Sequence, residues 1–155
     1  MKKLVVLGGG ESGIGAAALA KHNNWDVFVS DAGMLTAAAK KSFETIGVRY
    51  EEGGHNMNEI LKAELVVKSP GIPNTVDVIK DIEAAEIAMV SEIEFASNYT
   101  DATLIGITGS NGKTTTAMLT HHLLSDCGID AGLAGNIGNS FAQALLQDKH
   151  DVYVL

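Results

Sequence analysis

The chain has 155 residues, of which 46% are hydrophobic and 19% charged, so it can bury a core and is not a disordered or fibrous sequence. Its 19 acidic and 11 basic side chains give a formal net charge of -8, which repels a phosphate backbone and argues against nucleic acid as a partner. A single cysteine, Cys127, excludes an intrachain disulfide and a cysteine metal cluster, which fits a reducing compartment.

No segment of the sequence has the pattern of a membrane span or an export signal. The apolar run at residues 4–7 follows two lysines, as in a signal peptide, but three glycines interrupt it. No stretch approaches the roughly 18 apolar residues that a transmembrane helix needs. The sequence therefore predicts a soluble, cytoplasmic protein without membrane insertion.

Short strands and helices alternate from the N-terminus. Residues 3–7 form a continuously apolar, β-branched run, which is typical of a strand buried on both faces of a parallel sheet. We expect further strands at residues 26–30, 48–50, 64–68 and 88–90, and helices at 14–21, 35–46, 57–62 and 76–85. This alternation indicates βαβ units and predicts an α/β fold with a Rossmann-like parallel-sheet domain.

A polar stretch then separates two units. Ser91 and Glu94 have the spacing of a capping box, which predicts a helix to about residue 97 with Glu92 solvated in its first turn. Residues 98–102 are polar, lack apolar periodicity and form the candidate linker. We therefore place an N-terminal domain at residues 1–98 and the first part of a second domain at 99–155.

The second unit repeats the pattern and is expected to begin a P-loop-type α/β ATPase domain. We expect strands at residues 103–108, 131–134 and 151–155, and helices at 113–127 and 140–147. Leu119, Leu123 and Cys127 form one apolar face of the longer helix, and Cys127 is expected to be a small core residue. The sequence stops on a strand of buried type, so we expect the chain to be part of something longer.

A glycine-rich loop follows the first strand. Residues 8–13 read G-G-G-E-S-G, a G-x-G-x-x-G between a predicted strand and a predicted helix. Such a loop turns sharply, lets the backbone approach a phosphate and points helix N–H groups at negative charge. Asp31 follows Gly13 by 18 residues, near the spacing at which a carboxylate accepts hydrogen bonds from a nucleotide. The alternative is a tight turn in which Asp31 caps the next helix.

A second loop follows the strand at residues 103–108. It reads G-S-N-G-K-T-T at residues 109–115, and its backbone N–H groups are expected to cradle nucleotide phosphates. Lys113 would place its charge against the β- and γ-phosphates, and the Thr114 hydroxyl is the expected Mg²⁺ ligand. The loop departs from the standard P-loop because Ile107 stands where a first glycine is expected. A lysine at a helix N-terminus opposes the helix dipole unless an anion binds there, which favours a phosphate site over a plain turn.

The run at residues 109–115, followed by G-N-I-G at 135–138, resembles the ATP-binding signature of the Mur ligases and their folylpolyglutamate synthetase relatives. The first glycine loop, Asp31, the S-P-G-I-P run at 69–73 and the S-E-I-E run at 91–94 extend this resemblance along the whole chain. It implies an ATP- and Mg²⁺-dependent, ADP-forming ligase of peptidoglycan synthesis. In the branch that the motifs match best, D-glutamate is joined to UDP-N-acetylmuramoyl-L-alanine through an acyl phosphate.

The resemblance also implies roles for individual residues. Catalytic roles fall to Lys113, Thr114 and Asn136, with Thr114 as the metal ligand. The ATP phosphates would be bound by Gly109, Ser110, Asn111, Gly112, Lys113, Thr114 and Thr115. The UDP substrate would be bound by Gly10, Glu11, Ser12, Gly13, Asp31, Ser69, Gly71 and Asn136. Chains of this family are much longer, so residues 1–155 alone are expected to be inactive.

Three other interpretations stay open. An L-alanine-adding ligase of the same family would share the ATP motif. An NAD-dependent oxidoreductase would use the first glycine loop and Asp31 but would leave the second loop unexplained. A non-enzymatic nucleotide-binding module would use both loops without chemistry. Outside the loops, His55 is a minor candidate near the nucleotide groove, and Trp25 and Phe28 are expected to pack around the second strand.

Overall fold

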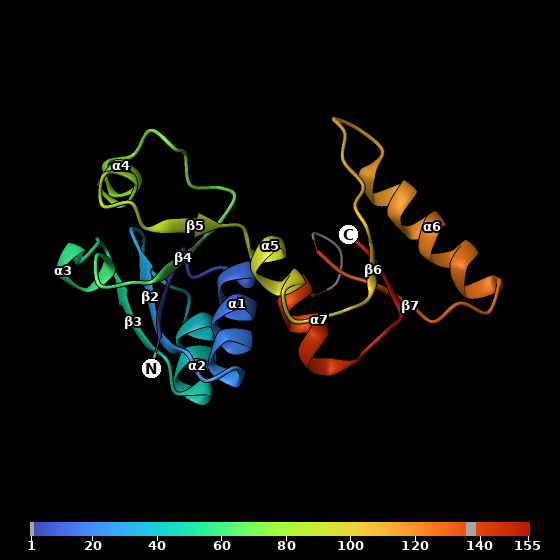
Figure 1. Cartoon of the computed structure of the whole chain (residues 1–155), viewed down its shortest axis with the longest axis horizontal. Helices are drawn as coiled ribbons and strands as arrows, with labels where there is room; N and C mark the ends of the chain where they lie inside the picture. The colour runs from blue at the N-terminus through green and yellow to red at the C-terminus, as the bar shows by residue number, and fades with distance from the viewer. Residues whose placement is uncertain (1, 136–138) are drawn as a thin grey trace.

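A computed structural model describes residues 2–135 and 139–155 of the chain (Figure 1). Within these residues, the first unit of the chain is built on a five-stranded parallel sheet. Its strands are β1 (Lys3–Leu7), β2 (Asp26–Asp31), β3 (Arg49–Glu52), β4 (Leu65–Lys68) and β5 (Ala88–Val90). They lie in the order β3-β2-β1-β4-β5 with every pair parallel. The strand order reverses between β1 and β4, and sheets of this kind bind ligands beyond the carboxyl ends of their strands at that point.

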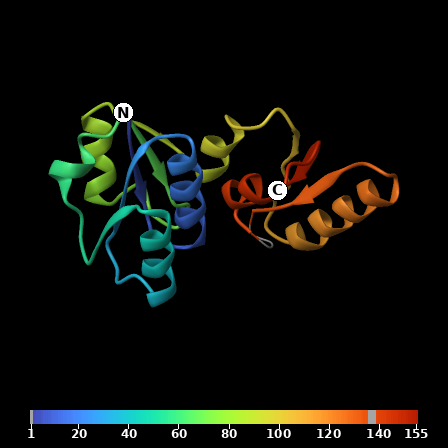
Figure 2. The same ribbon diagram turned by 90° about the horizontal axis from the view of Figure 1, so that it is seen from below.

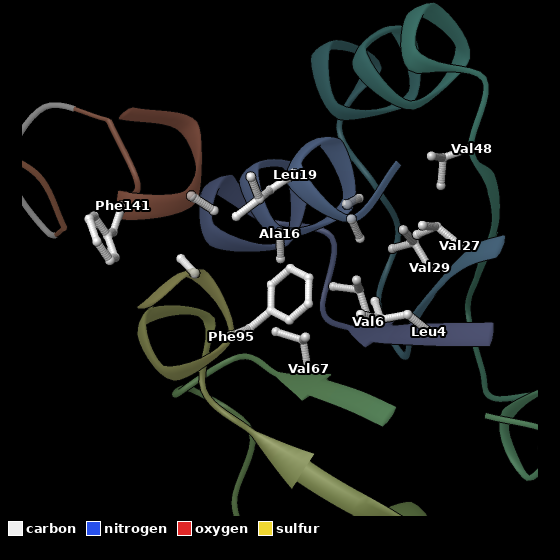
Figure 3. Packing of buried hydrophobic residues seen from close by; sticks show 14 of the residues in the cluster. Leu4, Val6, Ala16, Leu19, Val27, Val29, Val48, Val67, Phe95 and Phe141 are labelled. Carbon is white, nitrogen blue, oxygen red and sulfur yellow. The ribbon is translucent and has the colours of Figure 1, made fainter. Parts of the chain in front are cut away.

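Helices cover both faces of this sheet. They are α1 (Glu11–His22), α2 (Ala37–Ile46), α3 (Met57–Ile60), α4 (Asp77–Ala84) and α5 (Glu92–Ser97). Successive β1 side chains point to opposite faces. Leu4 and Val6 pack in the buried cluster that includes α1, α2 and α5 (Figure 3), whereas Val5 and Leu7 pack with α3 and α4. Both faces are buried, which explains why the sequence of β1 is apolar throughout.

The second unit is smaller. Its described strands are β6 (Thr103–Ile105), β7 (Ala131–Leu133) and β8 (Val152–Val154), which pair in parallel in the order β6-β8-β7. Its helices are α6 (Lys113–Asp126) and α7 (Phe141–Gln147). Figure 1 shows α6 on the side away from the first unit and α7 near the centre of the molecule.

The two units meet where α7 packs against α1 and α5 (Figure 2). Phe141 of α7 and Phe95 of α5 belong to the same buried cluster as the core of the first sheet. Helix α1 lies close to the start of α7 at Gly15, where an added Cβ would lie 2.0 Å from Ser140 Oγ. The absence of a side chain at this position therefore lets the helices approach.

The linker between the units is held in place by aromatic contacts. The Trp25 indole N–H donates a hydrogen bond to the Tyr99 hydroxyl at 2.8 Å. The Phe95 ring packs edge-on against both, with ring centroids 6.4 Å from Trp25 and 5.2 Å from Tyr99. Tyr99 is thus fixed although its neighbours are polar. The domain boundary placed after residue 98 stays a prediction.

The α/β fold class predicted from the sequence is confirmed, whereas several element ends differ. Helix α1 begins at Glu11 rather than at residue 14, so Glu11, Ser12 and Gly13 belong to its first turn. Helix α2 begins at Ala37 rather than at residue 35, because the Thr36 hydroxyl accepts a hydrogen bond from the N–H of Ala39 and caps the helix.

The apolar face expected on α6 is not buried. Leu119 is 55% exposed, Leu123 is 56% exposed and Cys127 is also exposed, whereas Ala117 is buried. The prediction that Cys127 is a core residue is therefore wrong. The sheet that α6 covers is only three strands wide in the described residues, and it leaves the outer face of the helix without a packing partner there.

Among residues 2–135 and 139–155, no helix combines the length and the apolar character needed to cross a bilayer.

Candidate functional site

The first glycine loop lies at the carboxyl end of β1, and its glycines have different surroundings. Gly8 has φ +94°, a conformation that favours glycine. An added Cβ at Gly13 would lie 2.0 Å from the Gly8 carbonyl oxygen, so only glycine lets α1 pack this closely on the turn. Gly10 has no atom within 4 Å of its virtual Cβ and is open. Gly8 therefore makes the tight turn, Gly10 leaves the backbone open to a ligand, and Gly13 allows close packing of the helix. A phosphate-binding loop requires all three features.

One oxygen of the Asp31 carboxylate holds this loop, and the other holds the turn that follows β2. One oxygen accepts the Gly9 N–H at 2.7 Å and the other accepts the Gly33 N–H at 2.8 Å. Asp31 does not cap α2, because Thr36 does. Its carboxylate joins the ends of β1 and β2, and each oxygen keeps a lone pair that can accept a further hydrogen bond.

A cavity of about 560 Å³ opens beside this loop, and we call it the first cavity. From the first unit, Gly10, Glu11 and Asp31 line it, together with an apolar wall that includes Ile14 and Leu35. From the second unit, Asn139, Ser140 and Gln143 line it. The cavity has the combination of apolar walls and a few polar groups that is typical of small-molecule sites.

The other described residues that are predicted to bind the substrate do not line the first cavity. Gly13 is buried under the loop. Ser69 follows β4 and lies against Gly8, where an added Cβ would be 2.5 Å from the Ser69 Oγ. Gly71 lies in the turn that follows. Ser12 lines a different cavity from Glu11, its neighbour on α1.

The second glycine loop lies between β6 and α6. Gly109 has φ +150° and Gly112 has φ +77°, and Gly112 occupies the N-cap position of α6. The Lys113 ammonium donates a hydrogen bond to the Gly109 carbonyl at 2.6 Å, so the loop curls around its own cation. All residues of this loop are exposed: Gly109, Ser110, Asn111, Gly112, Lys113, Thr114 and Thr115.

A second cavity, of about 530 Å³, lies between this loop and the first unit. It is lined by Thr108, Lys113 and Thr114 on one side and by Ser12, Pro70 and Glu92 on the other. Asn136, which the sequence assigns to the same region, lies outside the described residues. The structure thus brings Lys113 and Thr114 to a cavity that is also lined by Ser12 of α1. The preceding residue, Glu11, lines the first cavity.

Glu92 differs from its predicted state. The sequence predicts a solvated side chain, but Glu92 is 6% exposed and accepts a hydrogen bond from the N–H of Ala142 at the start of α7. Burial raises the pKa of Glu92, while the Ala142 N–H and the Ser140 hydroxyl act in the opposite direction. The local sequence holds no signal for this contact, because the partner lies 50 residues further along the chain.

His55 lines neither cavity. Ser30, which is fully buried, donates a hydrogen bond to Glu51 Oε1 at 2.6 Å and lies 2.7 Å from His55 Nδ1. The same Glu51 oxygen accepts the Asn56 N–H at 2.7 Å. This network fixes the loop after β3 and explains His55 without a ligand.

Two family descriptions match the chain. The one described as MurD N-terminal domain matches residues 3–78, and the one described as Mur ligase middle domain matches residues 107–153. The first match contains β1 to β4 and the first glycine loop, and the second contains the second glycine loop, α6, β7 and α7.

Curated proteins match over nearly the whole chain. UDP-N-acetylmuramoylalanine-D-glutamate ligases are 49% identical in Cytophaga hutchinsonii over 99% of this chain, and 50% identical in Bacteroides fragilis over 100%. The corresponding protein of Porphyromonas gingivalis is 51% identical over 98%. The chain spans 35% of the length of the first two relatives and 34% of the third.

Solved structures show the same arrangement. A pseudomurein peptide ligase type C from Methanothermus fervidus aligns with a TM-score of 0.61 and 32% identity over 100% of this chain and 32% of that one. A murein peptide ligase from Psychrobacter arcticus aligns with a TM-score of 0.62 over 99% of this chain and 37% of that one, and at 24% identity it supports the fold alone. Sequence and fold agree over both sheets, and we conclude that the chain belongs to the Mur ligase family.

Proposed function

We propose that this chain carries the uridine-nucleotide site and the ATP-phosphate site of a ligase that joins D-glutamate to UDP-N-acetylmuramoyl-L-alanine, with ADP and phosphate as products. One observation carries the proposal. Two glycine loops, each between a parallel strand and a helix, adjoin two cavities that share the N-terminus of α1, with Glu11 lining one and Ser12 the other. The names of the curated relatives favour D-glutamate over L-alanine as the amino acid.

In this proposal the first cavity binds the uridine diphosphate part of the substrate. Gly10 leaves room for the diphosphate, and the N-terminus of α1 offers N–H groups to it. The Glu11 carboxylate repels phosphate at short range. It therefore accepts a hydrogen bond from an O–H of the ribose or an N–H of the base instead. Asp31 keeps the loop in shape and offers its remaining lone pairs to the uracil end. Ser69 and Gly71 would line the same groove, and Asn136 would reach the substrate or nucleotide phosphates across the domain interface.

The second glycine loop binds the ATP phosphates in this proposal. Its donor set fits a triphosphate with a divalent cation: the Lys113 ammonium, the Thr114 hydroxyl and the backbone N–H groups of an exposed loop with two glycines at positive φ. Lys113 leaves the Gly109 carbonyl for the phosphates, and Thr114 would hold Mg²⁺. When bound, Mg²⁺ would neutralise part of the negative charge of the phosphates.

The proposed chemistry needs positioning and charge neutralisation more than acid–base groups. A carboxylate oxygen of the UDP substrate attacks the γ-phosphorus of ATP, and ADP leaves. The D-glutamate amine then attacks the acyl carbon, loses a proton and expels phosphate. The second cavity, which adjoins both units, is the proposed place where the substrate carboxylate meets the γ-phosphate.

Two further assignments belong to this proposal. We place the uridine-nucleotide domain at residues 1–98 and the first part of the ATP domain at residues 99–155. We also place the activity in the cytoplasm, where ATP is available.

A hybrid enzyme tests the proposed function. The matching 155-residue region of the Bacteroides fragilis ligase is replaced by this chain, and phosphate release is measured. We expect release only when ATP, UDP-N-acetylmuramoyl-L-alanine and D-glutamate are all present. A folded hybrid that binds neither nucleotide, beside an active parental enzyme, would contradict the proposal.

The same hybrid separates the alternatives. Release with UDP-N-acetylmuramate and L-alanine instead would identify the L-alanine-adding ligase. Tight binding of NADH without a response to the UDP substrate would favour the oxidoreductase. Binding of both nucleotides without turnover in the hybrid would favour a module that binds without chemistry.

A further inference from the structure

A buried carboxylate joins the two units of the chain. Glu92 lies in the first turn of α5, in the first unit, and accepts a hydrogen bond from the N–H of Ala142 in the first turn of α7, in the second unit. The first N–H groups of a helix have no partner within that helix, so an acceptor supplied by another element satisfies one of them. A carboxylate there is also favoured by the helix dipole.

The surroundings of this contact make α7 sensitive to it. Ser140, the N-cap residue of α7, is 3% exposed and lies beside Glu92. Its hydroxyl accepts a hydrogen bond from the Gln143 N–H at 3.3 Å. On the other side, Gly15 of α1 lets the Ser140 side chain approach closely. The start of α7 is therefore seated between α1 and α5, with Glu92 as the polar contact from α5.

The position of α7 determines where one wall of the first cavity lies. Ser140 and Gln143, which line that cavity, belong to the same helical turn as Ala142. The opposite wall, including Gly10 and Asp31, belongs to the first unit. Any shift of α7 against α5 therefore changes the width of the cavity.

We propose that Glu92 is a positioning residue that fixes α7 against the first unit and so sets the distance between the two walls of the uridine-nucleotide cavity. The part of this inference that concerns the nucleotide rests on the proposed function. The part that concerns the placement of α7 does not. The role proposed for Glu92 is positioning, because its Oε1 accepts the Ala142 N–H and so ties α5 to α7.

Spin labels on the two units test the placement directly. Cys127 is native, exposed and located at the end of α6 in the second unit, and Lys41 is exposed on α2 in the first unit. In the K41C background, we expect double electron–electron resonance to give one narrow distance distribution. Glu92→Ala removes the acceptor, and we expect a broad or shifted distribution. Glu92→Gln keeps an oxygen that can accept the Ala142 N–H, and we expect the narrow distribution to return.

A second variant keeps the test decisive if Glu92→Ala fails to fold. Glu92→Asp retains the charge but shortens the side chain by one methylene, so the carboxylate no longer reaches Ala142. We expect it to broaden the distribution while circular dichroism stays unchanged. A narrow, unshifted distribution in a folded Ala or Asp variant would overturn the proposal, even if its Tm is lowered, because a merely stabilising residue changes Tm without changing the distance.

Calorimetry with UDP supplies the second readout. Without the labels, we expect Glu92→Ala and Glu92→Asp to weaken UDP binding by about tenfold and Glu92→Gln to stay within about twofold of the unsubstituted chain. If the unsubstituted chain does not bind UDP, the proposed function fails while the distance measurement still tests the role of Glu92. If it binds UDP and the Ala and Asp variants bind it equally well, the positioning role fails while the proposed function stands.

Discussion

Gly10 and Gly13 belong to one motif but have opposite surroundings. An Ala methyl at Gly13 would lie 2.0 Å from the Gly8 carbonyl oxygen, whereas one at Gly10 would meet no atom within 4 Å. We expect Gly13→Ala to lower the free energy of unfolding by roughly 1–3 kcal/mol, the usual range for overpacking. Gly10→Ala is its matched control: we expect an unchanged Tm and weaker UDP binding. Urea unfolding and calorimetry measure the two effects. Equal loss of stability in both variants would contradict the assignment of these two glycines.

The ion pairs of Glu59 make the stability of the fold depend on pH. Hydrogen bonds from Lys3 at 2.7 Å and Lys62 at 2.8 Å lower the pKa of Glu59 from its ordinary 4.5 to about 2. A carboxyl group whose pKa falls on folding stabilises the fold above its unfolded pKa, and this contribution is lost as the pH falls through the folded value. We therefore expect Glu59→Gln to lower Tm at pH 7 and the difference from the unsubstituted chain to shrink between pH 4.5 and pH 2.

The matched control for Glu59 is Asp77, whose side chain is 94% exposed and pairs with Lys80 at 3.0 Å. An exposed pair of this kind contributes little to stability. Asp77→Asn should therefore leave Tm unchanged across the same pH range. A pH-independent difference in Tm for Glu59→Gln would show that its effect is not electrostatic.

The N-terminus of helix α6 is the proposed binding site for the ATP phosphates. Lys113 stands at its N-terminus, where a cation is unfavourable without an anion, and its ammonium is held by the Gly109 carbonyl. We expect Lys113→Ala to weaken ATP binding by roughly 10- to 100-fold, the loss of a hydrogen bond between charged groups, with an unchanged Tm. Binding of UDP is expected to stay the same, because the first cavity does not include this residue. Calorimetric titration with each nucleotide checks both statements, and equal loss of both would contradict the separation of the sites.

The sequence predicts elements better than their ends. The apolar run of β1 and the alternation that follows it were sufficient for the parallel sheet, because a strand buried on both faces leaves a clear pattern. The apolar pattern does not predict the start of α2, because the Thr36 side chain fixes it through one hydrogen bond. The glycine loops were recognised because a phosphate site imposes residue types at fixed spacing within one segment.

The contacts between the two units are the part of the molecule that the sequence does not predict. The sequence predicts a solvated Glu92 and gives no signal that Ser140 and Gln143 line the first cavity. The Glu92–Ala142 contact joins residues 50 positions apart, and the first cavity joins Gly10 and Asp31 to residues near 140, so no local periodicity or motif predicts either arrangement. The exposed Leu119 and Leu123 show the converse, since an apolar face does not specify what covers it.

In the proposed function, one chain holds two separate nucleotide sites, each at a strand-to-helix junction. Amide chemical shifts measured by NMR during titration with UDP and with ATP plus Mg²⁺ test it most directly. We expect UDP to shift the amides of Gly9, Gly10 and Glu11, and ATP to shift those of Gly112, Lys113 and Thr114. Both nucleotides shifting the same loop, or ATP leaving the second loop unchanged, would contradict the claim.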